Sequence, residues 1–202
     1  MKIQLLLILS LVCLSDLGAQ SDMPKMKSVF NGKNFKNWEV PEGNIWWSVK
    51  DGVLSVVNDP KLTGSILWTK KEYDNFVVQL DFKFGVGTVD SGIFMRGDGE
   101  DAPQIQIGIS GSLKRDMTAS PYVPKKGYPV EAEGIPELLK MDEWNTIKAQ
   151  AVGNQYKVWL NGKEVMNYTL ENAKLHGPIG LQLHPGKEMA IDFRNIVVAK
   201  LK

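Results

Sequence analysis

The chain has 202 residues and nearly equal numbers of basic and acidic side chains, 24 Lys and Arg against 23 Asp and Glu, so its formal net charge at pH 7 is +1. This balance, without a basic run or an alternating Lys/aromatic stripe, argues against nucleic acid as a partner. Beyond the N-terminus no apolar stretch reaches the ~18 residues of a membrane span. The oligomeric state stays open at this point.

The N-terminus has the layout of a secretory signal peptide, which we place at residues 1–19. Lys2 provides the positive start, residues 3–12 are apolar, and Leu17-Gly18-Ala19 forms a small-residue cleavage site. A lipoprotein signal acylated on Cys13 is the alternative, although Val12 fits the position before such a cysteine poorly. We expect an exported protein, periplasmic or extracellular, whose mature chain lacks cysteine and forms a single domain over residues 20–202.

Turn signals separate short apolar runs along the rest of the chain, which predicts an all-β domain. In residues 76–84, Phe, Val, Leu and Phe at even positions alternate with Val, Gln, Asp and Lys at odd ones, so one face of this strand points to a core. Asn161-Gly162 predicts a hairpin with a type I′ turn. Helix is expected only as single turns at residues 137–141 and 171–175.

Residues 111–140 break the alternating pattern and contain Pro121, Pro124, Pro129 and Pro136. A long segment without regular structure is often functional. It is also what a long connection between two sheets of a Greek key looks like. Both interpretations remain open from the sequence.

Polar residues on the outer faces of the predicted strands fall into two groups. The first consists of ordinary solvated side chains, assigned to a convex side: Gln79, Asp81, Lys83, Lys148, Gln150, Asp192 and Arg194. The second contains amides, an imidazole, a guanidinium and an aromatic ring: Phe94, Arg96, Gln104, Gln106, Gln182 and His184. Amides and Arg suit vicinal hydroxyl groups, and aromatic rings pack on the apolar face of a pyranose, so this second group predicts a saccharide site.

Each of these residues alone is also compatible with an ordinary surface position. His184 ends a strand beside Pro185-Gly186, where an imidazole can transfer protons, whereas His176 in a loop reads as structural. Five tryptophans are candidates for a stacking platform or for packing: Trp46, Trp47, Trp68, Trp144 and Trp159.

Several established chemistries lack their motifs in this chain. The E-x-D-x-x-E arrangement of jelly-roll glucanases is absent, and Glu131 and Glu133 lie in the proline-rich segment. No histidine or cysteine motif for a metal occurs, and the acidic loop at residues 97–101 reads as a solvated turn rather than a calcium site. We expect no metal and no cofactor.

Three strings carry a family resemblance: DSGIFMRG at residues 90–97, PQIQIGI at 103–109 and GLQLHPGKEMAIDFRNIVV at 180–198. Together with FNGKNFKNWEV at 30–40 and WLNGKEV at 159–165, they make the chain resemble the 3-keto-disaccharide hydrolase domain family, which consists of secreted bacterial proteins. The resemblance implies a two-sheet antiparallel jelly-roll sandwich of the concanavalin A-like lectin/glucanase type. The family commonly has Glu where this chain has Gln104.

The resemblance also implies cleavage of 3-keto-glycosides and 3-keto-disaccharides by base-assisted elimination and hydration, a route that needs a base and an oxyanion stabiliser but no carboxylate pair. We expect His184 to transfer the proton, Arg96 to stabilise the oxyanion and Asp90 to act as a second acid or base. The expected substrate-binding residues are Phe94, Gln104, Gln106 and Gln182. Two alternatives remain: a non-catalytic carbohydrate-binding module on the same scaffold, and a structural or adhesion sandwich without a small ligand.

Overall fold

The computed structural model describes residues 24–202. The predicted signal peptide at residues 1–19 and the alternative acylation at Cys13 lie outside this range. The elements in chain order are β1 (Lys27–Ser28), β2 (Trp38–Glu39), β3 (Trp47–Lys50), β4 (Val53–Val57), β5 (Ser65–Tyr73), β6 (Phe76–Gly87), β7 (Asp90–Phe94), β8 (Gln104–Gly108), β9 (Pro121–Tyr122), α1 (Ile135–Leu138), β10 (Asn145–Val152), β11 (Gln155–Leu160), β12 (Lys163–Thr169), β13 (Gly177–Leu183) and β14 (Met189–Lys200).

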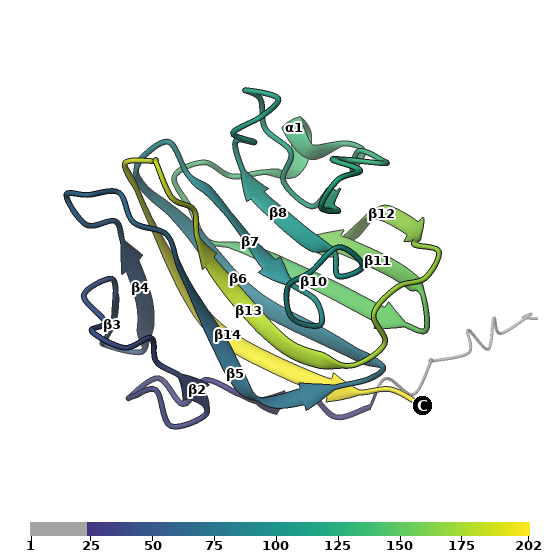
Figure 1. Ribbon diagram of the computed structural model, residues 1–202, viewed down its shortest axis with the longest axis horizontal. Helices are drawn as coiled ribbons and strands as arrows, with labels where there is room; N and C mark the ends of the chain where they lie inside the picture. Colours follow the sequence, from purple (N-terminus) through teal and green to yellow (C-terminus); the bar gives the residue numbers. More distant parts are fainter. Residues whose placement is uncertain (1–23) are drawn as a thin grey trace, which may run out of the picture.

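These strands form two antiparallel sheets packed face to face, as Figure 1 shows. One sheet has eight strands in the order β12-β11-β10-β6-β14-β4-β3, with β1 paired to β14. The other has six strands in the order β2-β5-β13-β7-β8-β9. The predicted all-β jelly-roll sandwich is confirmed. Within residues 24–202, no helix has the length and apolarity that a membrane crossing requires.

The core lies between the two sheets and follows the predicted alternation. Phe76, Leu80 and Phe82 of β6 are fully buried, and Ile93 of β7 and Ile105 of β8 are equally buried on the facing sheet. Because side chains on a strand alternate between its two faces, burial of these residues directs their neighbours to the outer surfaces. The strand parity read from the sequence thus decides which polar groups share a surface.

The predicted hairpin is present between β11 and β12. Its two turn residues, Asn161 and Gly162, have φ angles of 49° and 90°. A type I′ turn requires positive φ at both positions, which Asn tolerates and Gly adopts freely. The local sequence prediction is therefore correct in type as well as in place.

The helical turns are less well predicted. The only helix among the described residues is α1, which starts at Ile135 rather than at residue 137. Pro136 lies in its first turn, a position where the ring favours helix initiation. Residues 171–175 form no helix, because Asn172 adopts φ 59° and a left-handed residue interrupts helical geometry.

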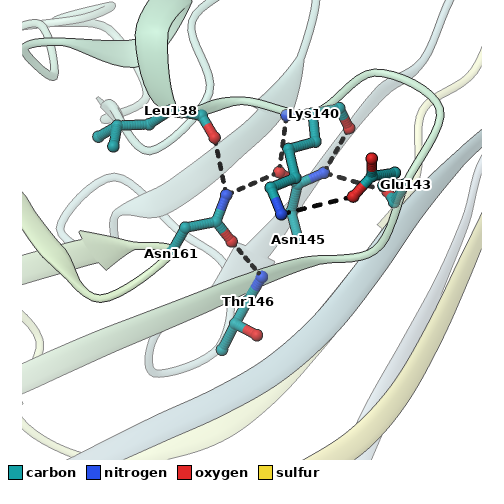
Figure 2. Close-up of polar contacts among 6 residues, drawn as sticks. All are labelled: Leu138, Lys140, Glu143, Asn145, Thr146 and Asn161. Atoms are coloured by element: carbon teal, nitrogen blue, oxygen red, sulfur yellow. Dashed lines mark hydrogen bonds and ion pairs between the residues drawn. The ribbon is translucent and has the colours of Figure 1, made fainter.

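A hydrogen-bonded cluster joins the end of the proline-rich segment to the β11–β12 turn, as shown in Figure 2. The fully buried Asn145 side chain accepts a hydrogen bond from the Lys140 amide at 2.9 Å and donates to the Lys140 carbonyl at 2.7 Å. Asn161 donates to Asn145 Oδ1 at 2.9 Å and to the Leu138 carbonyl at 2.8 Å. The segment from β8 to β10 is thus anchored where it reaches the eight-stranded sheet.

Candidate functional site

A hollow of about 430 Å³ lies on the outer face of the six-stranded sheet, beside the segment that follows β8. This volume falls within the ~300–1,000 Å³ typical of small-molecule sites. We call it the glutamine hollow, and its lining residues are Asp90, Gln104, Gln106, Ser110, Gly111, Ser112, Lys114, Tyr122, Tyr128, Gln182, His184, Gly186 and Lys187. The structure therefore brings together Asp90, Gln104, Gln106, Gln182 and His184, all of which the sequence predicted as site residues.

Sheet order explains this convergence. Strand β13 pairs with β7, and β7 pairs with β8, so residues far apart in sequence become neighbours on one face. Gln104 Nε2 donates to Gln182 Oε1 at 2.5 Å across β7. The bond passes over Gly92, where an added Cβ would lie 2.2 Å from Gln104 Nε2 and 2.7 Å from the Ile105 carbonyl oxygen. A residue larger than glycine at position 92 would displace this amide pair.

Asp90 supplies a buried carboxylate to the hollow. Its side chain is 3% exposed, and Oδ1 accepts a hydrogen bond from Gln106 Nε2 at 2.8 Å. Oδ2 is buried without a partner. A Cβ placed on Gly111 would lie 2.9 Å from this oxygen and 3.9 Å from Lys187 Nζ. The Asp90 carboxylate and the Lys187 ammonium group therefore both border the space beside Gly111. Buried polar atoms are normally satisfied, which makes Oδ2 a candidate contact for a ligand.

His184 is half-buried at the end of β13. Its Nδ1 lies 2.7 Å from the Pro185 carbonyl oxygen, an atom that can only accept a hydrogen bond, so Nδ1 carries the hydrogen. In the neutral ring the lone pair is then on Nε2. The backbone therefore selects the tautomer in which Nε2 can accept a proton.

Two tyrosines from the proline-rich segment form a wall that the sequence did not predict. The Tyr122 and Tyr128 rings lie 5.3 Å apart at 60°. Burial raises the pKa of Tyr128 to about 12, and the neighbouring Asp90 and Tyr122 add to this effect. Tyr128 is thus a neutral hydroxyl donor at physiological pH. The segment of residues 111–140 connects the two sheets, as a Greek-key connection would, and it also lines the hollow, so its functional interpretation stays a prediction.

The prediction that Arg96 faces outward is wrong. Its side chain is fully buried, with Nε donating to the Asp74 carbonyl at 2.8 Å and Nη1 donating to the Gly153 and Lys174 carbonyls at 2.7 and 3.0 Å. Nη1 also lies 3.0 Å from the Tyr156 hydroxyl. The strand parity fails here because β7 ends at Phe94, two residues earlier. Arg96 holds three backbone segments together and does not line the glutamine hollow.

Phe94 lies on the predicted outer side of the sheet but also outside the glutamine hollow. Its ring packs against Trp68 of β5, with ring centroids 5.2 Å apart. Both residues pair in register with Gly180 of β13, which lies between them. Phe94 therefore contacts a tryptophan rather than the space beside Asp90.

The solvated side chains assigned to a convex side do share a surface. They belong to β6, β10 and β14 of the eight-stranded sheet, where Lys148 pairs with Gln79 and Arg194 with Asp81. This is the opposite outer face of the sandwich from the glutamine hollow. Apart from Arg96, which is buried, the two predicted groups of polar residues therefore lie on two different faces.

Comparison with known proteins places the chain in a family of carbohydrate-related domains. A model described as the 3-keto-alpha-glucoside-1,2-lyase-like domain matches residues 25–199. No curated protein matches the chain.

Solved structures share the fold. A predicted glycosyl hydrolase from Parabacteroides distasonis ATCC 8503 is 26% identical over 88% of this chain and 100% of its own, with a TM-score of 0.65. A second from the same organism is 20% identical over 88% of this chain and 94% of its own, with a TM-score of 0.62. The carbohydrate-binding module CBM66 from Bacillus subtilis is 14% identical over 81% and 95% of the two chains, with a TM-score of 0.52.

The second and third of these likenesses support the fold alone, whereas the family model covers nearly all described residues. The match to the family model also confirms the family resemblance seen in the three sequence strings. The chain therefore belongs to the 3-keto-alpha-glucoside-1,2-lyase-like domain family and is a carbohydrate-active domain.

Proposed function

We propose that this protein cleaves 3-keto-glycosides, including 3-keto-disaccharides, by base-assisted elimination followed by hydration. The observation that carries the proposal is the pairing, in one hollow, of an imidazole with a free Nε2 and a buried carboxylate with a free Oδ2. Both groups can exchange protons with a bound sugar. Family membership supports the same class of substrate.

The elimination needs two proton transfers, the hydration needs two more, and no covalent intermediate with the protein forms. A ketone at C3 makes the hydrogen on C2 acidic, so a base can remove it and leave an enolate. The electron pair then forms the C1–C2 double bond, the C1–O bond breaks, and the leaving oxygen takes up a proton. Water adds back across the double bond, with the hydroxyl at C1 and the proton at C2, which completes a net hydrolysis.

In this proposal His184 Nε2 accepts the proton from C2. Asp90 provides the second proton-transfer group through Oδ2, while Gln106 holds its other oxygen in place. The enolate oxygen needs donors or positive charge. The Tyr128 hydroxyl and the Lys187 ammonium group take the role first assigned to Arg96, because they line the hollow and Arg96 does not.

The amides of Gln104 and Gln182 bind sugar hydroxyls. The two side chains are joined by one hydrogen bond, which leaves three amide hydrogens and the Gln104 carbonyl oxygen available on the pair. Phe94, predicted as a direct sugar contact, packs against Trp68 and does not line this hollow.

A conventional glycosidase mechanism is less well supported by this hollow. Retaining enzymes need two carboxyl groups about 5 Å apart, and inverting enzymes need two at a longer spacing. Asp90 is the single carboxylate among the residues that line the glutamine hollow. Glu131, whose spacing to Glu133 resembled a pair in the sequence, is instead ion-paired with Arg115.

We also propose that residues 1–19 direct export to the periplasm or the cell exterior, on the basis of their sequence pattern. N-terminal sequencing of the protein recovered from the periplasmic and extracellular fractions tests this. A mature N-terminus at Gln20 supports cleavage after Ala19. A protein retained in the cytoplasm with Met1 intact contradicts it.

The catalytic proposal is tested by incubating the purified protein with a 3-keto-disaccharide and with its unoxidised parent. We expect release of the leaving sugar from the keto compound and none from the parent, because the parent lacks an acidic C2 hydrogen. Product analysis by mass spectrometry in H₂¹⁸O checks that the new oxygen comes from water.

A carbohydrate-binding module remains the second candidate, favoured by one observation. Gln104 stands where the family commonly has Glu. Its amide, which is hydrogen-bonded to Gln182, cannot deliver a proton as a carboxyl group could. Saccharide binding without turnover of any 3-keto-glycoside would support the module. Neither binding nor turnover would support a structural sandwich.

A further inference from the structure

A second hollow of about 430 Å³ adjoins the glutamine hollow on the same outer face of the six-stranded sheet. The two hollows meet at Gln182, which lines both. We call the second one the tryptophan hollow. Its walls include Pro41, Glu42, Trp46, Ile66, Trp68 and Pro185. The character of the surface therefore changes across Gln182, from amide and ionisable groups to mainly apolar ones.

Trp68 is held rigidly as one wall of this hollow. It pairs in register with Gly180, where an added Cβ would lie 2.4 Å from Trp68 Cζ3 and 2.5 Å from Cε3. The ring thus lies directly against the backbone of β13, and Phe94 packs against it with centroids 5.2 Å apart. A preorganised ring loses little entropy when a ligand packs on it.

The boundary between the hollows lies at the proposed proton-transfer group. His184 lines the glutamine hollow, and the next residue, Pro185, lines the tryptophan hollow. A hydrogen bond of 2.7 Å from His184 Nδ1 to the Pro185 carbonyl oxygen ties the two together. A substrate that occupies both hollows would place the bond between its two rings close to the imidazole.

We propose that the tryptophan hollow is the subsite for the leaving-group pyranose of a disaccharide substrate, with the keto-bearing ring in the glutamine hollow. This assignment rests on the proposed function. A pyranose has an apolar face that packs on an aromatic ring and an edge of hydroxyl groups. Trp68 and Ile66 offer the apolar surface, while Gln182 and Glu42 offer polar atoms.

The test compares two 3-keto-glucosides that differ only in the leaving group, a methyl group or a second pyranose. For Trp68→Ala we expect KM to rise roughly five- to tenfold with the disaccharide, the range expected for loss of an aromatic contact. With the methyl glycoside we expect KM to stay within about twofold. Gly180→Ala should act in the same direction, since the added methyl group displaces the ring.

Trp159→Ala is the matched control, because this tryptophan lies on the eight-stranded sheet with Lys148 Nζ 4.0 Å from its ring centroid. It should leave both KM values unchanged. An equal rise for both substrates in Trp68→Ala, or no rise for the disaccharide, would overturn the subsite. Urea unfolding of each variant shows whether an equal rise reflects a damaged fold.

Binding measurements separate this inference from the catalytic proposal. Calorimetric titration with an unoxidised disaccharide and with its methyl monosaccharide gives a ratio of Kd values that requires no turnover. We expect wild-type protein to prefer the disaccharide, and Trp68→Ala to bring the ratio close to one. An unchanged ratio overturns the subsite even if the enzyme is active. Absence of turnover with a Trp68-dependent ratio overturns the proposed reaction and, with it, the leaving-group role, but supports the tryptophan hollow as a binding site for a second pyranose.

Discussion

Each outer face of the sandwich carries one carboxylate with several polar neighbours, Asp81 on one face and Asp90 on the other, and the two differ in how many of their oxygens accept hydrogen bonds. On the eight-stranded sheet, Asp81 Oδ1 accepts a hydrogen bond from Thr146 Oγ1 at 2.7 Å, and Oδ2 accepts from Asn195 Nδ2 at 2.7 Å and Arg194 Nε at 3.3 Å. On the six-stranded sheet, Asp90 Oδ1 has Gln106, whereas Oδ2 has no partner. A carboxylate with both oxygens occupied stabilises the fold, and one with a free buried oxygen is available to a ligand.

Aromatic residues on the two faces differ in the same way. On the eight-stranded sheet, Arg194 and Lys148 lie 4.0 Å from the ring centroids of Trp144 and Trp159. Cation–π contacts of this kind cover the ring faces. Trp68 on the six-stranded sheet is instead packed against Phe94 and lines an open hollow. On the eight-stranded sheet, the faces of these tryptophan rings are covered by side chains of the protein itself. On the six-stranded sheet, Trp68 still has ring surface that a ligand could contact.

The largest expected effect concerns the two histidines. His184→Gln should lower kcat on a 3-keto-disaccharide by about 10²–10⁴-fold, the usual contribution of a general base, with little change in sugar affinity. Stopped-assay kinetics and calorimetric titration measure the two quantities. His176→Gln is the control, since His176 is exposed and bonded to Asp74 and Glu72 away from the hollow. An unchanged kcat in His184→Gln removes the imidazole from the mechanism.

The two arginines should differ in stability. Arg96→Met removes several hydrogen bonds from a fully buried cation and leaves backbone carbonyls unpaired. We expect the free energy of unfolding in urea to fall by about 3–5 kcal/mol. Arg194→Met breaks a partly exposed pair with Asp81 and should cost about 1 kcal/mol or less. Normal stability with lost turnover in Arg96→Met would restore the catalytic role predicted from the sequence.

The two carboxylates should respond in opposite ways. Asp90→Asn should lower kcat by about 10–100-fold, since an amide cannot exchange the proton, while the free energy of unfolding changes by about 1 kcal/mol or less. Asp81→Asn should leave kcat unchanged and lower the free energy of unfolding by about 1–3 kcal/mol, because it disturbs three hydrogen bonds. Equal effects of both changes on kcat would show that the two faces are not functionally distinct.

The smallest expected effect is a pH dependence of stability that comes from His176. Hydrogen bonds that the ring donates to the Asp74 and Glu72 carboxylates raise the pKa of this exposed imidazole above its ordinary value of 6.5. Because the folded pKa is raised, the stabilisation is complete below about pH 6.5 and is lost as pH rises through the folded pKa. Thermal unfolding of wild type and His176→Gln between pH 5 and 8 should show a small difference at low pH that disappears at high pH. A difference that grows with pH contradicts the expected sign.

Sequence periodicity predicted most of the fold and part of the site. Side chains alternate within each strand for local geometric reasons, so the burial of Ile105 and Leu181 places Gln104, Gln106 and Gln182 on an outer face. The alternation did not predict the position of the Arg96 side chain, because β7 ends at Phe94, before this residue. Tyr122 and Tyr128 could not be placed from the sequence, since the proline-rich segment has no period. Two tyrosines in a long segment next to a predicted site were the only available signal.

The sequence by itself determined the all-β fold, the type I′ turn at Asn161-Gly162 and which side chains of each strand avoid the core. These depend on interactions between residues close together in the chain. Only the tertiary structure decided that β13 lies between β5 and β7. That placement joins Gln182 to Gln104 and makes Gln182 a wall of both hollows, because the order of strands in a sheet results from packing between distant segments.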